Sequence, residues 1–230
     1  MIEYSDFSEL KTVKLYYETA LKKLESKLKV INDEFDILGN NPIDYIKIRM
    51  KSLSSITDKL KRKKLDINAN NTFILKDVVG ARIICDFIDD VYKVIDKIKT
   101  EKDIVILEEK DYIRKPKESG YRGYHIIICI PITIDGIKKN INAEIQIRTK
   151  AMDFWASSEH KLNYKKLGLS LADKLELKKL ADEVWNMDII MNSLEKKVLI
   201  NNDLIFGKVN RGINIDIIRE LLNWRMQNEI

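Results

Sequence analysis

Apolar residues near the start of the chain return in alternating steps of three and four positions. From Leu10 to Leu38 this spacing places a single apolar seam along one amphipathic helix, as in a coiled coil. The seam ends at 39–42, where Gly-Asn-Asn-Pro combines a helix-ending glycine with a proline that cannot continue the helix. The sequence therefore predicts a long N-terminal helix over 10–38.

The next segment changes from helical spacing to a mixed pattern. A short strand-like stretch at 43–51 precedes a helix that opens at Ser54-Ser55. Ser55 and Asp58 have the spacing of a capping box, in which two side chains satisfy the free N–H groups of the first helical turn. We therefore expect a strand followed by a capped, basic helix.

β-rich runs dominate the middle of the chain and are interrupted by one helical pattern near 90–101; the runs are 78–88, 104–109, 124–134 and 141–148. Asp135-Gly136 separates the last two runs and is a strong signal for a two-residue hairpin turn. These two runs should therefore be antiparallel neighbours. Because long helices are predicted on both sides of the strands, the expected fold class is α+β.

Helical spacing returns at 151–166 and then in a second apolar seam at 171–198. Residues 201–230 open with a polar Asn-Asn break and carry a modest helical pattern at 215–224. We therefore divide the chain into a single domain at 1–200 and a helical extension at 201–230, whose role the pattern does not define. The two apolar seams indicate self-association through helices, although packing inside one subunit produces the same pattern.

Composition places the chain among globular proteins, since 45% of its 230 residues are hydrophobic and can form a full core. The chain has no apolar run of the roughly 18 residues that a membrane span needs, and its start lacks the order of a signal peptide. We expect a cytoplasmic protein. Cys85 and Cys129 each lie inside an apolar run, which favours reduced core thiols over a disulfide or a metal site.

Basic residues gather at 59–64 and 114–117, although the net charge is only +5. A solvated helix face is the ordinary explanation for such a run, and the phosphates of a nucleotide are the alternative. The near balance of 41 basic and 36 acidic residues argues against a dedicated nucleic-acid binder.

A polar face is predicted on the strand at 141–148. Residues two apart share a face, so Glu144, Gln146 and Arg148 line up while the apolar residues between them face the core. If the hairpin turns at 135–136, paired residue numbers sum to 271 and His125 joins this face opposite Gln146. A longer loop would shift that pairing, but it would leave Glu144 and Gln146 together.

An acid and a guanidinium flank the start of the buried run at 78–88. Asp77 precedes the run and Arg82 follows five positions later. Mg²⁺ prefers oxygen ligands and usually takes one or two carboxylates together with substrate phosphates, so Asp77 and Glu144 would suffice on neighbouring strands. The alternative is a surface role for Asp77, as a cap or as an ion-pair partner of a nearby cation.

Lys51, Ser55 and Lys59 surround the predicted start of a helix, where free N–H groups and the positive dipole end favour a phosphate. An ordinary capped basic helix is the alternative. The sequence contains no GxxxxGK[ST] string, which excludes a P-loop kinase at the level of motifs.

The loop at 118–125 combines glycines with aromatic and basic side chains. Tyr121 could stack on a purine base, and Lys117 and Arg122 are available for phosphates. Aromatic residues beside glycine also occur in plain hairpin packing, which is the alternative here.

Four strings together carry a resemblance to a known family; they are DVVGARI at 77–83, SGYRGYH at 119–125, AEIQIRT at 143–149 and AMDFWASSEHKLNYK at 151–165. In order and spacing, from about residue 10 to 200, they resemble the synthetase domain of the RelA/SpoT family, specifically its stand-alone, RelQ-like small alarmone synthetases. The resemblance implies a nucleotidyltransferase-like, mixed and largely antiparallel sheet flanked by helices. It also implies transfer of pyrophosphate from ATP to the 3′-hydroxyl of GDP, GTP or GMP in the stringent response.

The same resemblance implies roles for individual residues. It assigns ATP binding to Arg49, Lys51, Ser55, Lys59 and Arg82, with the two arginines around the adenine, and acceptor binding to Lys117, Tyr121, His125, Gln146 and Asp153. Asp77 and Glu144 would hold Mg²⁺, the implied cofactor, and Glu144 would act on the 3′-hydroxyl. RelQ-like relatives imply a homotetramer. The preferred acceptor stays open.

Two other functions remain open beside this one. The first is a catalytically silent regulator on the same fold that binds nucleotides or RNA, although the presence of both Asp77 and Glu144 argues against it. The second is a nucleotidyltransferase that transfers a nucleoside monophosphate. A His-Asp hydrolase site is not expected, because the only histidines, His125 and His160, precede Ile and Lys. RNA is not required for the predicted reaction, and regulation by RNA remains compatible with it.

Overall fold

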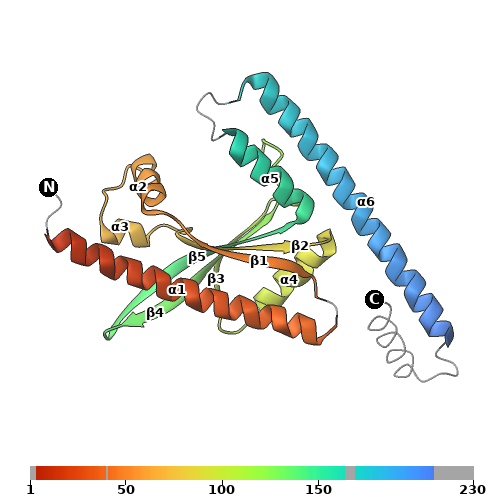
Figure 1. Ribbon diagram of the computed structural model, residues 1–230, viewed down its shortest axis with the longest axis horizontal. Helices are drawn as coiled ribbons and strands as arrows, with labels where there is room; N and C mark the ends of the chain where they lie inside the picture. The colour runs from red at the N-terminus through yellow and green to blue at the C-terminus, as the bar shows by residue number, and fades with distance from the viewer. Residues whose placement is uncertain (1–3, 40, 164–168, 210–230) are drawn as a thin grey trace, which may run out of the picture. The chain divides into compact units, whose positions relative to one another are not determined.

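The computed structural model describes residues 4–39, 41–163 and 169–209 of the chain. In these ranges the elements are α1 (Tyr4–Ile37), β1 (Ile43–Met50), α2 (Leu53–Arg62), α3 (Ala69–Phe73), β2 (Val79–Cys85), α4 (Ile88–Thr100), β3 (Val105–Asp111), β4 (Tyr124–Ile134), β5 (Ile137–Thr149), α5 (Lys150–Asn163) and α6 (Leu171–Val209) (Figure 1). The chain divides into a compact unit, Met1–Asp188, which contains the sheet, and a second unit, Ile189–Ile230. The expected α+β class is confirmed. The division at 200 and 201 stays a prediction.

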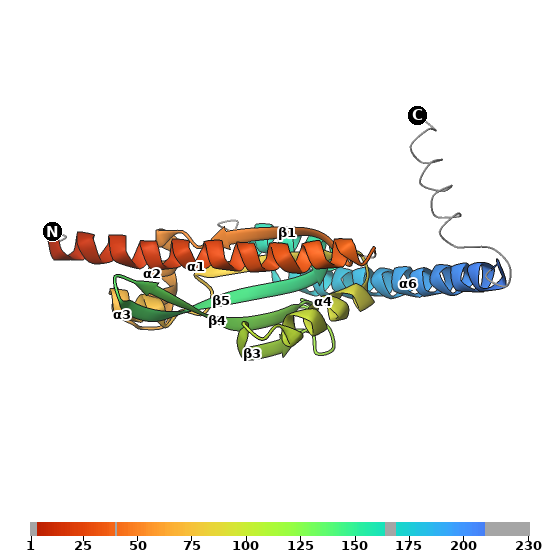
Figure 2. The same ribbon diagram turned by 90° about the horizontal axis from the view of Figure 1, so that it is seen from below.

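The sheet has five strands in the order β1-β2-β5-β4-β3. β2 and β5 run parallel, and the other three neighbouring pairs are antiparallel. Apolar residues of α1 and α4 form one core cluster with alternate residues of β2, β4 and β5. Figure 2 shows α1 lying along the strands. The opposite face of the sheet is therefore left for polar side chains.

The β4–β5 hairpin has the register that its turn predicts. His125 pairs with Gln146, Ile127 pairs with Glu144, and the ladder closes at a two-residue turn. Asp135 and Gly136 both have positive φ, at 53° and 75°, which is the geometry that matches the twist of two antiparallel strands. Because the turn is this short, β5 begins at Ile137 and not at 141 as the sequence pattern predicted.

Two local predictions were wrong in detail. The N-cap of α2 is Ser52, whose Oγ accepts from the Ser55 N–H at 3.3 Å, so Ser55 lies inside the helix and does not cap it. Helix α6 also passes through Asn201 and Asn202 without a break, because two polar residues weaken a helix but do not end it. The helical pattern expected at 215–224 lies outside the described residues.

The apolar seam of α1 packs within the subunit. Val13, Tyr17, Leu24, Leu28 and Ile31 are all buried in the main core. These seam residues therefore pack inside the subunit, which was the alternative given for the pattern, and self-association stays a prediction.

The start of α6 differs from α1. Leu175 and Met187 remain 56% and 52% exposed, so self-association through the second seam stays a prediction.

Cys85 and Cys129 are free thiols, and burial raises the pKa of Cys85. Among the described helices, none has both the length and the apolar character that crossing a membrane requires.

Leucine truncations along α1 test this packing. Leu28→Ala should lower the free energy of unfolding by about 2–5 kcal/mol, because it leaves a cavity at a side chain that is 1% exposed. Leu15→Ala on the same helix removes a 47% exposed side chain and should change it by less than about 0.5 kcal/mol. Urea unfolding measures both, and equal losses would contradict the assignment of the two faces.

Candidate active site

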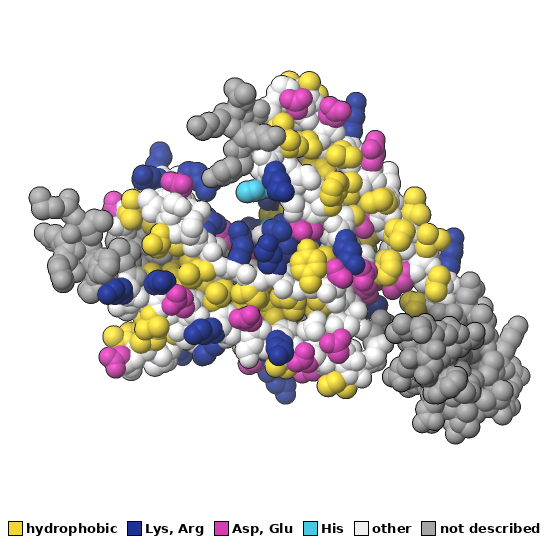
Figure 3. All heavy atoms as spheres, viewed as in Figure 1, with side chains coloured by type: hydrophobic (Ala, Val, Ile, Leu, Met, Phe, Trp, Pro, Cys, Tyr) yellow, Lys and Arg dark blue, Asp and Glu magenta, His cyan; other side chains and the backbone are white. Residues whose placement is uncertain are grey.

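The polar face of the sheet opens into a cavity of about 1500 Å³ in the compact unit. Lys and Arg side chains gather around a hollow on this side of the molecule (Figure 3). Among the described residues that line it, eight are Lys or Arg and two are Asp or Glu; the basic ones are Arg49, Lys51, Lys61, Arg62, Arg82, Lys117, Arg148 and Lys161. Pockets for one drug-sized ligand measure about 300–1000 Å³. This cavity therefore has room for more than one small anionic ligand.

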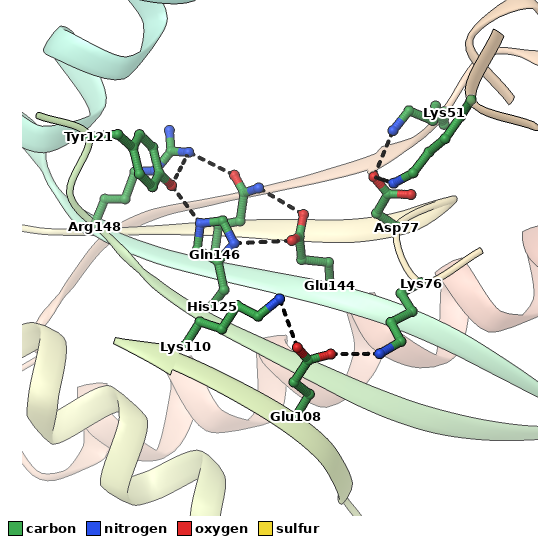
Figure 4. A network of polar contacts seen from close by, with 11 residues as sticks. Lys51, Lys76, Asp77, Glu108, Lys110, Tyr121, His125, Glu144, Gln146 and Arg148 are labelled. Carbon is green, nitrogen blue, oxygen red and sulfur yellow. Dashed lines mark hydrogen bonds and ion pairs between the residues drawn. The ribbon is translucent and has the colours of Figure 1, made fainter. Parts of the chain in front are cut away.

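Glu144 projects from β5 toward this cavity and is held at both carboxylate oxygens. Its Oε1 lies 3.1 Å from His125 Nδ1, and its Oε2 accepts from Gln146 Nε2 at 2.8 Å (Figure 4). Burial by itself raises the pKa of this carboxyl, but the hydrogen bonds and charge of its partners outweigh burial and lower the pKa. Glu144 is therefore an ionised carboxylate with a fixed orientation.

A buried arginine fixes which way the protons point around Glu144. Arg148 Nε and Nη2 lie 3.2 and 2.7 Å from the Tyr121 hydroxyl, and both can only donate. The hydroxyl proton of Tyr121 is then directed to His125 Nε2, 2.5 Å away. A neutral His125 consequently carries its proton on Nδ1 and donates it to Glu144.

Arg148 also connects the remaining polar groups. It donates to Gln146 Oε1 at 3.0 Å and to Asp153 Oδ1 at 2.9 Å. The same Asp153 oxygen lies 3.0 Å from Arg82 Nη1, so one carboxylate is shared by two guanidinium groups. The sequence placed Arg148 on the polar face but assigned it no role. Arg148 lies two positions after Gln146 and four after Glu144, and this spacing was the signal in the sequence that could have assigned it to the site.

Asp77 forms a second charged centre between β1, α2 and β2. Lys51 and Lys59 place their Nζ atoms 2.8 and 2.5 Å from Asp77 Oδ2. Figure 4 shows Lys51 pointing toward Asp77. Burial raises the pKa of this carboxyl, but the hydrogen bonds from both lysines outweigh burial and the pKa is lowered. The Lys51 N–H also donates to the Val78 carbonyl at 2.8 Å, which ties the end of β1 to the segment that carries Asp77.

The two carboxylates suit a hard cation. Within the described residues Asp77 Oδ1 is buried and accepts no hydrogen bond, and the charge of Asp77 acts on Glu144. Both project from the same side of the sheet (Figure 4). The described part of the chain contains no cage of three or more His, Cys, Asp or Glu residues. Such a pair fits Mg²⁺, which usually takes one or two carboxylates and fills its other positions with phosphate and water.

Comparison with known proteins identifies the family to which the chain belongs. The family described as "Region found in RelA / SpoT proteins" matches residues 48–168, more than half of the chain. The chain belongs to the RelA/SpoT family. It is 42% identical to GTP pyrophosphokinase YwaC of Bacillus subtilis over 188 residues, which cover 80% of this chain and 89% of YwaC.

Solved structures of small alarmone synthetases of the RelA/SpoT family share the fold. The B. subtilis small alarmone synthetase 1 bound to its product pppGpp has a TM-score of 0.76 at 34% identity and covers 82% of this chain and 97% of its own. The same synthetase bound to AMPCPP has a TM-score of 0.69 at 28% identity, with 84% and 98% covered. B. subtilis small alarmone synthetase 2 has a TM-score of 0.74 at 40% identity, with 82% and 99% covered.

The RelA/SpoT motif residues converge on one cavity. Eight of the twelve residues singled out from the sequence line it directly: Arg49, Lys51, Ser55, Arg82, Lys117, Tyr121, His125 and Gln146. The other four, Lys59, Asp77, Glu144 and Asp153, connect to the lining through the hydrogen bonds and ion pairs described above. Lys61 and Arg62 line the cavity too, so the basic run at 59–64 is more than a solvated helix face. Their roles in binding and catalysis remain predictions.

Arg122 departs from expectation. The sequence suggested that it is available for phosphates, but its guanidinium lies over the Trp185 ring of α6, 4.2 Å from the ring centroid. The residue therefore connects the loop to α6 and does not line the cavity.

Asp77→Asn should lower the free energy of unfolding at pH 7 by about 2 kcal/mol, because two lysines lose their shared carboxylate. The pKa of Asp77 is lower in the folded chain than its ordinary value of about 4. Its contribution is therefore complete above pH 4 and is lost as the pH falls through the folded pKa. Urea unfolding should show the difference at pH 7 and a smaller one at pH 3.

Asp58→Asn provides the matched control, since Asp58 is an exposed carboxylate of α2 at the same cavity. It should change stability by less than about 0.5 kcal/mol. A loss for Asp77→Asn that is equally large at both pH values would contradict the ion-pair account.

Proposed function

We propose that this chain is a GTP pyrophosphokinase that makes the alarmones ppGpp and pppGpp. The observation that carries this proposal is a single basic cavity in which an ionised, doubly anchored Glu144 lies among residues for two nucleotides. The relative YwaC bears the name GTP pyrophosphokinase, and the similar small alarmone synthetase 1 was solved with pppGpp and with AMPCPP. This chain would transfer the β,γ-pyrophosphate of ATP to the 3′-hydroxyl of GDP, GTP or GMP and release AMP. It would act in the cytoplasm, where these nucleotides are available.

ATP would bind at the β1, β2 and α2 side of the cavity. Arg49 and Arg82 lie on adjacent strands, Arg49 opposite Gly80, and both line the cavity, where planar guanidinium groups can stack on an adenine. Ser55 lies in the first turn of α2, whose free N–H groups favour phosphate. Lys51 and Lys59 would exchange part of their contact with Asp77 for the ATP phosphates.

The acceptor would bind at the loop that carries Tyr121. Lys117 Nζ and Arg148 Cζ lie 4.8 and 5.0 Å from the Tyr121 ring centroid, so this ring already attracts cations. A guanine stacked on it would displace the Lys117 ammonium and leave that charge for the acceptor's phosphates. His125 and Gln146 would orient the ribose beside Glu144, and Asp153 would hold Arg82 and Arg148 in place.

The transfer itself needs a proton acceptor and neutralisation of charge. The 3′-oxygen would form a bond to the β-phosphorus of ATP while the bond from that phosphorus to the α,β-bridging oxygen breaks, and AMP leaves with the electron pair. Glu144 would accept the hydroxyl proton. Mg²⁺ held by Asp77 and Glu144 would neutralise phosphate charge and acidify the hydroxyl. The lysines and arginines of the cavity supply the remaining positive charge, which is the main need of phosphoryl-type transfer.

The direct test is incubation of the purified chain with γ-³²P-ATP, Mg²⁺ and GMP, GDP or GTP, followed by thin-layer chromatography. Label should move to a more highly phosphorylated guanine nucleotide, with an equal amount of AMP, and transfer should stop when EDTA removes Mg²⁺. The three acceptors are ranked in the same assay. A folded protein that transfers label to none of them would favour a silent nucleotide-binding or RNA-binding regulator.

Glu144→Gln should lower kcat by about 10²–10⁴-fold, because the amide cannot take the hydroxyl proton. The KM for ATP should change by less than about twofold, since the ATP residues lie on other elements. Glu109→Gln is the control: Glu109 is an ion-paired glutamate of β3, 2.6 Å from Lys99, and its loss should leave kcat nearly unchanged. Similar kcat values for Glu144→Gln and the unaltered chain would remove Glu144 from the chemistry.

Tyr121→Ala should raise the acceptor KM by about 5- to 150-fold, which is the fold-change that corresponds to losing the stack of one base on an aromatic ring. The KM for ATP should stay within about twofold. Tyr121→Phe keeps the ring but removes the hydroxyl between Arg148 and His125, so it should spare the acceptor KM and lower kcat. An acceptor KM that is unchanged in Tyr121→Ala would place the guanine elsewhere.

A further inference from the structure

Two consecutive residues of the acceptor loop face opposite ways. Tyr121 lines the cavity, whereas Arg122 lies against α6 with its Cζ 4.2 Å from the Trp185 ring centroid. Arg122 Nη1 donates to the Ile113 carbonyl at 2.7 Å, which joins the loop to the end of β3. Its Nε is buried and has no hydrogen-bond partner among the described residues. Its contacts with α6, the stack on Trp185 and the charge of Asp182, therefore account for a large part of what holds this side chain.

The main chain of the loop also rests on α6. Gly120 has a φ of +90°, and a Cβ at this position would lie 2.5 Å from Ala181 Cβ. A cavity of only about 10 Å³ separates the two elements around Arg122 and Trp185. The loop and the helix are thus in close contact, and the glycine is required by both its conformation and the space.

Helix α6 is held to the sheet by other bonds. Trp155 Nε1 of α5 donates to the Leu177 carbonyl at 3.0 Å, and Thr149 Oγ1 at the end of β5 donates to Asp188 Oδ2 at 2.5 Å. Neither bond involves residues of the loop. The first half of α6 is consequently held to α5 and β5 by contacts other than the one with Arg122.

We propose that Arg122 and Trp185 are positioning residues for the acceptor, because their stack fixes the loop at 117–123 against α6. Fixing the loop from behind sets the place of the Tyr121 ring and of Lys117 in the cavity. Glycines at 120 and 123, both with positive φ, leave the loop backbone free to shift once the stack is removed. This inference rests on the proposed function for the identity of the acceptor as a guanine nucleotide.

Loss of the stack should act on one substrate only. In Arg122→Met and in Trp185→Leu the acceptor KM should rise about tenfold, which is the fold-change expected when a desolvated cation–π contact is lost. The KM for ATP should stay within about twofold, and Trp185→Phe, which keeps a ring, should restore most of the acceptor affinity. Both single variants remove the stack, and Arg122→Met also removes the bond to the Ile113 carbonyl, so the double variant should be no worse than Arg122→Met alone.

Lys115→Met is the matched control, since it removes an exposed cation from the same loop region and should leave both KM values unchanged. Urea midpoints confirm that each variant is folded. Equal increases in the KM for ATP and for the acceptor would indicate general loosening and overturn the proposal. Additive effects in the double variant would overturn it as well.

Binding of GDP alone, measured by titration calorimetry without ATP, separates this proposal from the activity. Arg122→Met should weaken GDP about tenfold relative to the unaltered chain. If that weakening occurs while no pyrophosphate is transferred, the positioning role stands and the proposed activity fails. If transfer occurs but GDP binds equally to both proteins, or if the unaltered chain does not bind GDP, the positioning role is wrong.

Discussion

The parallel pairing of β2 with β5 is the contact on which the site depends. It places Gly80 opposite Glu144 and Arg82 opposite Gln146, although these residues lie more than sixty positions apart in the sequence. Asp77, which lies two residues before β2, is thereby brought near the Glu144 carboxylate of β5. Antiparallel neighbours on both sides add Arg49 from β1 and His125 from β4. The only parallel ladder of the described sheet thus joins the predicted ATP and acceptor groups.

Charge in the cavity is balanced by carboxylates that also orient the cations. Asp77 holds Lys51 and Lys59, and Asp153 holds Arg82 and Arg148. A polyphosphate that entered the cavity would offer the same cations new oxygen partners, so its binding would be an exchange of ion pairs and not the capture of free charges. Such an exchange limits the cost of burying many like charges together before substrate arrives. It also keeps the side chains in place for the reaction.

The loop between β3 and β4 has two functional sides. Tyr121 and Lys117 face the basic cavity, and Gly120 and Arg122 face α6. Contacts with α6 therefore help to fix the position of this loop. In this chain the support is a helix that is anchored to β5 and α5, which are the elements that also carry Glu144 and Asp153. The predicted acceptor side of the cavity is therefore built around the end of β5 from several directions.

Local patterns in the sequence determined much of this protein. Period-two spacing grouped Glu144 with Gln146, and Asp135-Gly136 set the register that brings His125 opposite Gln146, because side-chain alternation and turn geometry are properties of neighbouring residues. The tertiary structure decided what depends on distant segments. The α1 seam proved to be core once the sheet was present to cover it. Arg122 turned from the cavity to Trp185, and Arg148 became the link between Tyr121 and Asp153, since only the folded chain brings those partners within reach.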